Sequence, residues 1–320
     1  MQSDRVCVVV MLRAFIAVLA ILPVSLAQEL NAIRVNVRLV NVAFTVRDAQ
    51  GKLVTNLAKD DFEVFDDGQA QPISFFARGE DLPLTLGLIV DFSGSQEHFV
   101  KQHQHDLGVF LKDVLSARDR AFLVCFGNHL RLASDFSSSG SELIEGLKKL
   151  EKREVPEIGP REYRTAGTAF YDAIYHATTL KLAQADQGRR ALIIFSDGED
   201  NSSAHNMMDT IEAAQTENVV LFGIRYTETR KGGEWTARNK YGASVMARMS
   251  HDTGGSDFDA QAADLRTSFR EIGEQLRSSY ELAYHAGGIA DGTFHKLVIR
   301  VKKPGFTVRT KTGYFSRDGE

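Results

Sequence analysis

Four continuous apolar runs, separated by stretches with helical spacing, mark the middle of the chain. The runs are LTLGLIVDF, AFLVCFG, ALIIFSDG and VVLFGIRY. Such a run is typical of a parallel strand that is buried on both faces of its sheet. Because parallel strands that alternate with helices need crossover connections, residues 84–279 are predicted to form a doubly wound α/β domain.

The segments around these runs predict the helices of that domain. Helices are expected over residues 97–115, 141–151, 169–182, 207–216 and 262–280. A further helix is expected to end at the glycines of SVMARMSHDTGG, since glycine accepts the left-handed conformation of a helix C-terminus. A short strand is expected around Asp257.

Both flanks of this region have a different pattern. Residues 35–76 alternate apolar and polar positions around turns such as AQGK and DDG, and the tail repeats this pattern in YELAY, HKLVIRVKK and FTVRTKTGYF. Alternation with period two predicts β-strands, but either flank alone has few strands for a stable sandwich. We therefore expect residues 28–82 and 281–320 to pair into one small all-β sandwich, into which residues 83–280 are inserted. Two independent extensions are the alternative.

The N-terminus has the pattern of a secretory signal. Arg5 and Arg13 give the N-terminus a positive charge. A short apolar run follows from Ala14 to Val24, and small residues come after it at Ser25 and Ala27. This order predicts cleavage after Ala27 and a secreted or periplasmic protein, with an uncleaved anchor as the alternative. No second long apolar stretch follows, so we expect no stable membrane insertion after cleavage.

Composition narrows the class of protein. The chain has 320 residues, 43% hydrophobic and 25% charged, which is ordinary for a globular protein. A net charge of −4 gives no reason to expect a nucleic-acid partner. Of the two cysteines, Cys7 lies in the predicted signal and Cys125 in an apolar run, so we expect no internal disulfide and a buried Cys125.

Oxygen-bearing side chains follow two of the predicted buried strands. Asp91, Ser93 and Ser95 follow the first run, and Asp197 follows the third. Thr168 stands at the start of a predicted helix between them. Ligands of open parallel sheets bind beyond the carboxyl ends of the strands, so these side chains are expected at one edge of the sheet.

The donor types predict which ion such a site would take. Hydroxyl and carboxylate oxygens suit a hard cation, Mg²⁺ in the first place with Mn²⁺ or Ca²⁺ as alternatives, and disfavour zinc or copper. Neutral hydroxyl ligands leave the ion with unbalanced positive charge, so it can accept a carboxylate from a partner.

These residues resemble a known motif. DxSxS at Asp91, Ser93 and Ser95, Thr168 in GTxxxDA, and Asp197 in SDGED are similar to the metal-ion-dependent adhesion site of von Willebrand factor type A (VWA) domains. The resemblance implies that all five residues serve a bound metal. The flanks resemble a secreted bacterial VWFA-related subgroup. Together these similarities imply a secreted protein that binds the acidic side chain of a protein partner through Mg²⁺.

Plainer interpretations exist for several residues. Asp91 and its serines could cap the following helix. Glu199 and Asp200 are expected to be solvated loop residues, and Asp172 a surface or capping residue. His98, His103 and His105 do not share one helical face, so no zinc pair is expected there, and the other histidines are read as ordinary: His176, His205, His251, His285 and His295.

An enzymatic function is not expected. The chain lacks the G-x-S-x-G elbow of α/β-hydrolases, a P-loop and a dinucleotide fingerprint. A hydrolase built on Ser93 or Ser95 with Asp197 and His98 is one alternative to adhesion. The other is a scaffold module of a cell-envelope complex in which the metal is only structural.

Overall fold

The computed structural model describes most of the chain after residue 37. The described residues are 38–79, 82–127, 129–151, 157–158, 167–185, 188–228, 233–261, 264–287 and 292–316. The predicted signal, residues 1–27, lies outside them. Among the described residues, no helix combines the length and apolar character needed to cross a bilayer.

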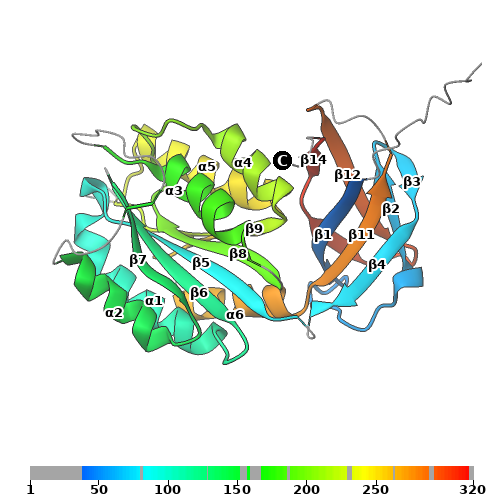
Figure 1. Ribbon diagram of the computed structural model, residues 1–320, viewed down its shortest axis with the longest axis horizontal. Helices are drawn as coiled ribbons and strands as arrows, with labels where there is room; N and C mark the ends of the chain where they lie inside the picture. The colour runs from blue at the N-terminus through cyan, green and yellow to red at the C-terminus, as the bar shows by residue number, and fades with distance from the viewer. Residues whose placement is uncertain are drawn as a thin grey trace, which may run out of the picture. The chain divides into compact units, whose positions relative to one another are not determined.

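A six-stranded sheet forms the centre of the α/β region (Figure 1), in the order β10-β9-β8-β5-β6-β7. All its strand pairs are parallel except β6 with β7. Every residue of β5 is buried, as expected for a central strand covered on both faces. The strands are β5 (Leu84–Asp91), β6 (Arg120–Phe126), β7 (Leu130–Ser137), β8 (Arg189–Ser196), β9 (Val219–Arg225) and β10 (Asp257–Asp259).

Helices cover both faces of this sheet, each over its own hydrophobic core. One face packs against α1 (Val100–Val114), α2 (Gly140–Glu151) and α6 (Leu265–Arg277), with the 3₁₀ turn η3 (Gly94–Phe99) leading into α1. The other face packs against α3 (Phe170–His176), its π-helical continuation η4 (Ala177–Leu182), α4 (Met207–Thr216) and α5 (Ala237–Asp252). The predicted doubly wound α/β fold is therefore confirmed.

Two details differ from the sequence prediction. Strand β7 was not predicted, because at an edge of the sheet its residues are mostly half-buried and lack the continuous apolar run of its neighbours. The last helix was predicted to reach Tyr280, but α6 ends at Arg277. Tyr280 instead begins β11, where its ring packs in the core of the β-sandwich.

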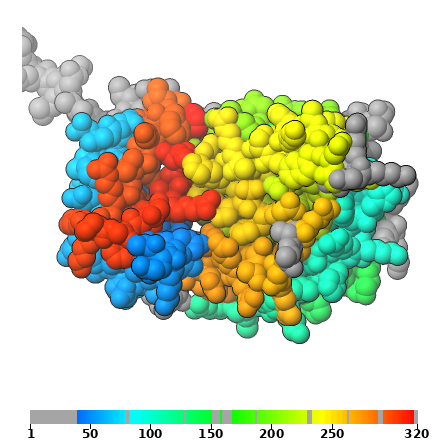
Figure 2. Space-filling view, turned by 180° about the vertical axis from the view of Figure 1, so that it is seen from behind, coloured from blue at the N-terminus to red at the C-terminus, as the bar shows by residue number. Residues whose placement is uncertain are grey.

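The flanks form a sandwich of two four-stranded sheets, ordered β13-β1-β11-β4 and β14-β12-β2-β3. Each sheet combines strands from both ends of the chain, and Figure 2 shows these distant segments side by side. The all-β sandwich predicted from the two flanks is confirmed, while its boundaries at residues 82 and 281 stay a prediction. The elements are β1 (Arg38–Arg47), η1 (Lys59–Asp61), β2 (Phe62–Asp66), β3 (Gln69–Gln71), β4 (Ile73–Arg78), β11 (Tyr280–Ala286), β12 (Phe294–Val301), β13 (Thr307–Thr310) and β14 (Gly313–Phe315).

Aromatic rings hold the two sheets of the sandwich together. The rings of Phe44, Phe62, Phe76 and Tyr280 form a cluster with centroid separations of 5.1 to 5.7 Å. Rings of this size bury large apolar areas, and edge-to-face pairs add to that gain. The Tyr280 hydroxyl also donates to the Val54 carbonyl at 2.9 Å, so its polar end is satisfied inside the core.

The C-terminal tail also contacts helix α4 through a buried lysine. Lys311 is only 5% exposed, and its Nζ donates to the Gln215 carbonyl at 2.8 Å. Burial lowers the pKa of Lys311 to about 7, although the charge of Glu217 acts in the opposite direction. The next residue, Thr312, donates its backbone N–H to the Asp252 carbonyl at 3.1 Å.

Candidate metal centre

The chain changes direction in the central sheet between β5 and β8. From β5 it moves outward to β6 and β7, then returns to β8 on the other side and continues outward to β9 and β10. Such a switch point leaves a crevice beyond the carboxyl ends of the two strands. Asp91 is the last residue of β5 and Asp197 directly follows β8, so both carboxylates lie at this point.

Asp91 is fully buried and organises the loop after β5. Its Oδ1 accepts a hydrogen bond from the Ser93 backbone N–H at 2.9 Å. Its Oδ2 accepts from the Ser196 hydroxyl at 2.6 Å, which links the ends of β5 and β8. The plainer alternative for Asp91, capping of the following helix, is not what its carboxylate does: its contacts lie within its own loop and with the neighbouring strand.

Two serines connect this loop to the second carboxylate. The hydroxyl oxygens of Ser93 and Ser95 lie 3.2 Å apart, and the Ser95 hydroxyl donates to Asp197 Oδ2 at 2.7 Å. The other oxygen of Asp197 accepts the Glu199 N–H at 2.9 Å. Four of the five predicted residues therefore meet in one hydrogen-bonded cluster.

Thr168 lies on an adjoining loop that is tied to both strand ends. The backbone N–H of Ala169 donates to the Gly127 carbonyl at 2.9 Å, and Gly127 packs against the backbone of Phe92 and Ser93. On its other side, the Thr168 N–H donates to Asn201 Oδ1 at 2.7 Å. Thr168 itself is 7% exposed.

Gln96 belongs to this cluster and was missed in the sequence. Its side chain is fully buried, and Nε2 donates to Asp197 Oδ2 at 2.8 Å and to the Tyr226 carbonyl at 3.2 Å. Gln96 lies outside the DxSxS motif of Asp91, Ser93 and Ser95. Only its place next to Ser95, at the start of a predicted helix, could have indicated it.

The charges of the cluster favour a bound cation. Burial, and secondly the nearby charge of Asp197, raise the pKa of Asp91 to about 7. Two buried carboxylates this close repel each other, and a positive ion between them and the hydroxyls would offset that repulsion. The donor set, all oxygen and partly neutral, fits a hard divalent cation such as Mg²⁺.

The acidic residues near the cluster are structural rather than solvated. Asp200 was expected to be a solvated loop residue, yet its Oδ1 accepts the Phe170 N–H at 2.9 Å and so caps α3. Glu199, also expected to be solvated, is half-buried and pairs with Arg238 at 2.5 Å. The surface role expected for Asp172 is wrong as well, since it is fully buried and accepts the His205 N–H at 2.9 Å.

The histidines differ in their surroundings. His98 is exposed, whereas His103 is buried with its ring centroid 4.3 Å from that of Tyr226. Burial lowers the pKa of His103 to about 4, against a smaller opposing effect of the Asp91 backbone, so it is neutral at pH 7. His176 and His205 were predicted to be ordinary histidines; their rings meet edge to face at 5.4 Å beside Asp172.

Gly167 is needed to place Thr168. Its φ is +131°, and a Cβ added there would lie 2.7 Å from Asn201 Oδ1 and from Ser202 Cβ. We expect Gly167→Ala to displace the Thr168 loop and weaken Mg²⁺ binding by about tenfold or more, since supporting contacts of a metal site have effects of this size. A Mg²⁺ titration followed by thermal shift measures this. Gly233→Ala, at φ +78° with open space around its Cβ position, is the matched control, and equal Mg²⁺ affinities in both variants would contradict the prediction.

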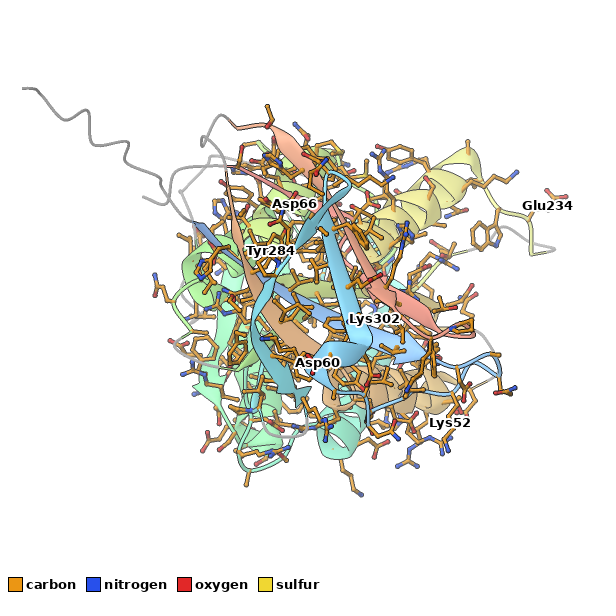
Figure 3. The ribbon with its side chains drawn as sticks, turned by 90° about the vertical axis from the view of Figure 1, so that its right-hand side faces the viewer. Lys52, Asp60, Asp66, Glu234, Tyr284 and Lys302 are labelled. Carbon is orange, nitrogen blue, oxygen red and sulfur yellow. The ribbon has the colours of Figure 1, made fainter. Side chains whose placement is uncertain are left out.

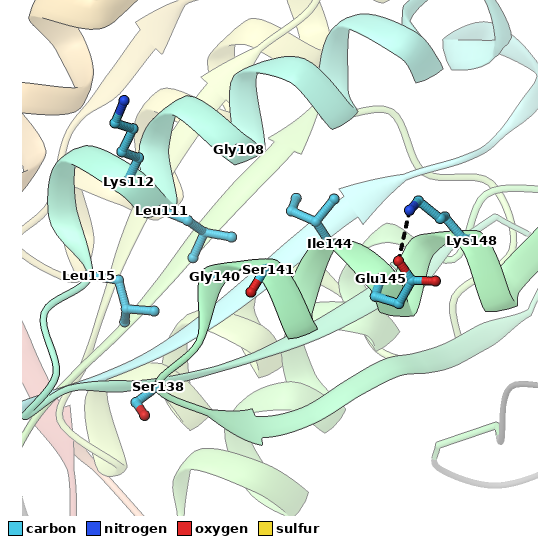
Figure 4. A pocket seen from close by; sticks show the side chains of 10 residues that line it. All are labelled: Gly108, Leu111, Lys112, Leu115, Ser138, Gly140, Ser141, Ile144, Glu145 and Lys148. Atoms are coloured by element: carbon cyan, nitrogen blue, oxygen red, sulfur yellow. Dashed lines mark hydrogen bonds and ion pairs between the residues drawn. The ribbon is translucent and has the colours of Figure 1, made fainter.

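A surface groove of about 570 Å³ lies elsewhere in the α/β region, between α1 and α2 (Figure 4). Leu111, Leu115 and Ile144 give it an apolar floor, and the Glu145–Lys148 ion pair stands at one end. None of its lining residues belongs to the strand-end cluster, by which we mean Asp91, Ser93, Ser95, Thr168 and Asp197, so the groove is separate from the candidate metal centre.

Comparison with known proteins gives matches among solved structures alone: no family model and no curated protein matches the chain. The structure is similar to the conserved hypothetical protein BatB from Bacteroides thetaiotaomicron, with 14% identity over 60% of this chain and 97% of that one, at a TM-score of 0.44. It is similar to manganese-loaded TRAP protein from Plasmodium vivax, with 14% identity over 79% and 99% of the two chains and a TM-score of 0.40. It is also similar to proximal thread matrix protein 1 from the mussel byssus, described with a zinc-occupied MIDAS motif, with 11% identity over 67% and 50% and a TM-score of 0.45.

Proposed function

We propose that the chain is a metal-dependent binding protein, because the residues that resemble a VWA adhesion site meet at the switch point of its doubly wound α/β sheet. Its proposed ion is Mg²⁺, with Mn²⁺ or Ca²⁺ as alternatives. The proposed ligands and supports are the five residues of the strand-end cluster, Asp91, Ser93, Ser95, Thr168 and Asp197. With the predicted signal at residues 1–27, the place of action is proposed to be the periplasm or the cell exterior.

One observation carries the proposal: hydroxyls and carboxylates from both sides of the switch point share hydrogen bonds. Ser95, on the β5 side, donates to Asp197, on the β8 side, at 2.7 Å. Asp91 is bonded to the Ser196 hydroxyl across the same gap at 2.6 Å. Oxygen atoms held this close by separate loops are preorganised for a shared cation, because little rearrangement is needed on binding.

Each residue has a distinct role in this arrangement. Asp91 fixes the backbone of Ser93, and Asp197 orients the Ser95 hydroxyl. Gln96 neutralises part of the charge on Asp197 through its amide. A bound divalent ion would keep part of its positive charge, because the Ser93, Ser95 and Thr168 hydroxyls are neutral, and that charge would attract the carboxylate of an acidic side chain on a protein partner.

The geometry favours binding over hydrolysis. A serine nucleophile needs its hydroxyl bonded to a general base, usually a histidine. Here the Ser95 hydroxyl donates to a carboxylate, Ser93 lies beside Ser95, and His98 points from an exposed position on η3. We therefore propose no enzymatic activity for this cluster.

A capture experiment tests the proposed function. Immobilised protein without the predicted signal would be exposed to envelope and extracellular extracts with Mg²⁺, with chelator, and with chelator followed by excess Mg²⁺. We expect partners to be captured only when Mg²⁺ is present and to be displaced by a Glu-containing peptide but not by its Gln counterpart. The variant Ser95→Ala should lose capture, whereas Ser244→Ala, an exposed serine on α5, should keep it.

The same experiment separates the alternatives. If chelator lowers the melting temperature but leaves the captured partners unchanged, the metal is structural and the chain acts as a scaffold module. If the protein turns over ester or phosphate substrates and Ser93→Ala abolishes this turnover, it is a hydrolase. Either result would contradict the binding function proposed above.

A further inference from the structure

A second group of metal-ligating side chains lies in the β-sandwich, outside the α/β region that carries the strand-end cluster. It consists of Asp66 at the end of β2, Asp67 in the following turn, and His295 near the start of β12. The turn is tight, with φ of +47° at Asp67 and +80° at Gly68. Two hydrogen bonds tie the turn to β12. The Asp67 N–H donates to the Lys296 carbonyl at 2.9 Å, and the Lys296 N–H donates to Asp67 Oδ1 at 2.8 Å.

Asp66 is a buried carboxylate with one oxygen satisfied and the other not. It is 7% exposed, and its Oδ2 accepts from the hydroxyls of Tyr284 at 3.1 Å and Tyr314 at 2.6 Å. Asp66 lies on β2 of one sheet and Tyr284 on β11 of the other, and both are labelled in Figure 3. Among the described residues, Asp66 Oδ1 has no hydrogen-bond donor although it is buried. An unsatisfied buried carboxylate oxygen is costly, so this atom indicates a missing partner.

The unsatisfied oxygen faces a histidine. Asp66 Oδ1 lies 3.8 Å from His295 Nδ1, which is too long for a hydrogen bond, and Asp67 Oδ2 lies 3.0 Å from the same nitrogen. The three donor atoms lie within 4.8 Å of one another. Two ligands of one tetrahedral zinc ion stand about 3.4 Å apart, since each is about 2.1 Å from the metal. The distances from His295 Nδ1 to Asp66 Oδ1 and to Asp67 Oδ2, 3.8 and 3.0 Å, lie on either side of that value.

The surroundings fix the imidazole in the orientation that a metal ligand needs. The His295 ring stacks on Tyr314 with centroids 5.1 Å apart and an angle of 16° between the planes. Its other nitrogen, Nε2, lies 3.3 Å from the Thr293 hydroxyl oxygen, which can accept a hydrogen bond from an Nε2–H. Metal-bound histidines commonly donate their second N–H to such an oxygen. Asp67 and His295 are partly exposed, which leaves solvent access for further water ligands.

We propose that Asp66, Asp67 and His295 bind a divalent transition-metal ion of the Zn²⁺ class. One imidazole nitrogen and two carboxylate oxygens suit such an ion better than the all-oxygen set of the strand-end cluster. On binding, the ion would replace the 3.0 Å hydrogen bond between His295 Nδ1 and Asp67 Oδ2, with Nδ1 as ligand and the imidazole proton on Nε2. The ion also supplies the partner that Asp66 Oδ1 lacks.

A metal ion bound at this site would link the N-terminal and C-terminal segments of the sandwich. Asp67 and His295 are 228 residues apart in sequence, and they belong to the N-terminal and C-terminal halves of the sandwich. A bond that closes so long a loop restricts the unfolded chain, and binding that requires the folded site stabilises the fold. Zn²⁺ is therefore a stabilising ligand of the sandwich.

Cobalt and zinc titrations of the protein without its predicted signal test the site. Both are carried out in excess Mg²⁺ and in a Ser95→Ala background, so that the strand-end cluster does not contribute. We expect one equivalent of Co²⁺ to give the visible absorption of a low-coordinate N/O site, and Zn²⁺ to displace it and raise the melting temperature. Asp67→Asn and His295→Phe should each weaken binding by more than about tenfold, because a ligand matters at least as much as its supports.

The variants are chosen to keep the fold. Asparagine tolerates positive φ and can still accept the Lys296 N–H, and phenylalanine can still stack on Tyr314. His285→Phe, an exposed histidine on β11 of the same sandwich, is the matched control and should bind like the parent. Equal Co²⁺ binding by His295→Phe and His285→Phe would overturn the proposal, and so would a cobalt signal that is seen only with Ser95 intact. Neither of these cobalt results changes the expected capture of the partner. The zinc-site proposal can therefore be contradicted without contradicting the proposed function, and the reverse.

Discussion

Replacing Asp91 with alanine is expected to abolish Mg²⁺-dependent capture of the partner. The substitution removes one of two buried carboxylates and leaves two donors, the Ser93 N–H and the Ser196 hydroxyl, without their acceptor. The β5 loop would then lose the conformation that places Ser93 beside Ser95. We expect the apparent Mg²⁺ affinity to fall by more than about 100-fold, beyond the effect of removing a supporting contact. Isothermal titration with Mg²⁺ and capture at saturating Mg²⁺ measure the two effects.

The fold must be shown to survive this change. Circular dichroism at low temperature provides that control, because it shows whether the variant keeps its helices and strands. Ser95→Ala removes one hydroxyl and leaves both carboxylates, so it should produce a smaller loss, roughly 10- to 100-fold in affinity. Capture that is unchanged in Asp91→Ala and in the presence of chelator would rule out a metal bridge to the partner.

Replacing Lys311 with methionine is expected to stabilise the protein near neutral pH and to flatten its pH dependence. Burial lowers the pKa of Lys311 from 10.5 to about 7 in the folded state. Between these values the unfolded chain holds a proton that the folded chain does not, so stability rises with pH through this window and is lowest below it. For this residue alone, the free energy of unfolding should increase by about 2–3 kcal/mol from about pH 6 to about pH 9.

Denaturant unfolding of both proteins across this pH range measures the difference. Methionine fills a similar volume and has no charge to bury, so that slope should disappear in Lys311→Met. The matched control is Lys302→Met, since Lys302 is exposed on the same tail (Figure 3) and its removal should leave the slope intact. If Lys311→Met and the unmodified protein show the same dependence on pH, burial does not lower the pKa of Lys311 in the folded protein as stated above.

The sequence was most informative where hydrophobic runs mark strand ends. Asp91 and Asp197 could be assigned to one edge of the sheet because each directly follows a fully apolar run, and the structure brings them together through Ser95. Thr168 was harder to place, because its position depends on contacts of Gly127 and Asn201 from two other loops. The order of these three residues along the chain does not indicate that their loops touch.

Residues whose role depends on backbone groups elsewhere were misread. Asp172 and Asp200 look like ordinary acidic residues of a helix and a loop, yet they accept N–H groups from segments about 30 residues away. His295 looked ordinary because the carboxylates beside it come from the other end of the chain. Strand β7 was missed since an edge strand with one open side needs no continuous apolar run.

The interleaving of both chain ends in each sheet of the sandwich sets an order for folding during synthesis. Strand β1 leaves the ribosome early, but its partners β11 and β13 are made only after the whole α/β region. The α/β region has all of its own strands by then and can fold first, because its contacts are more local. The N-terminal strands therefore wait, with open edges, for about 240 residues of translation, and chaperones that shield such edges should matter most in that interval.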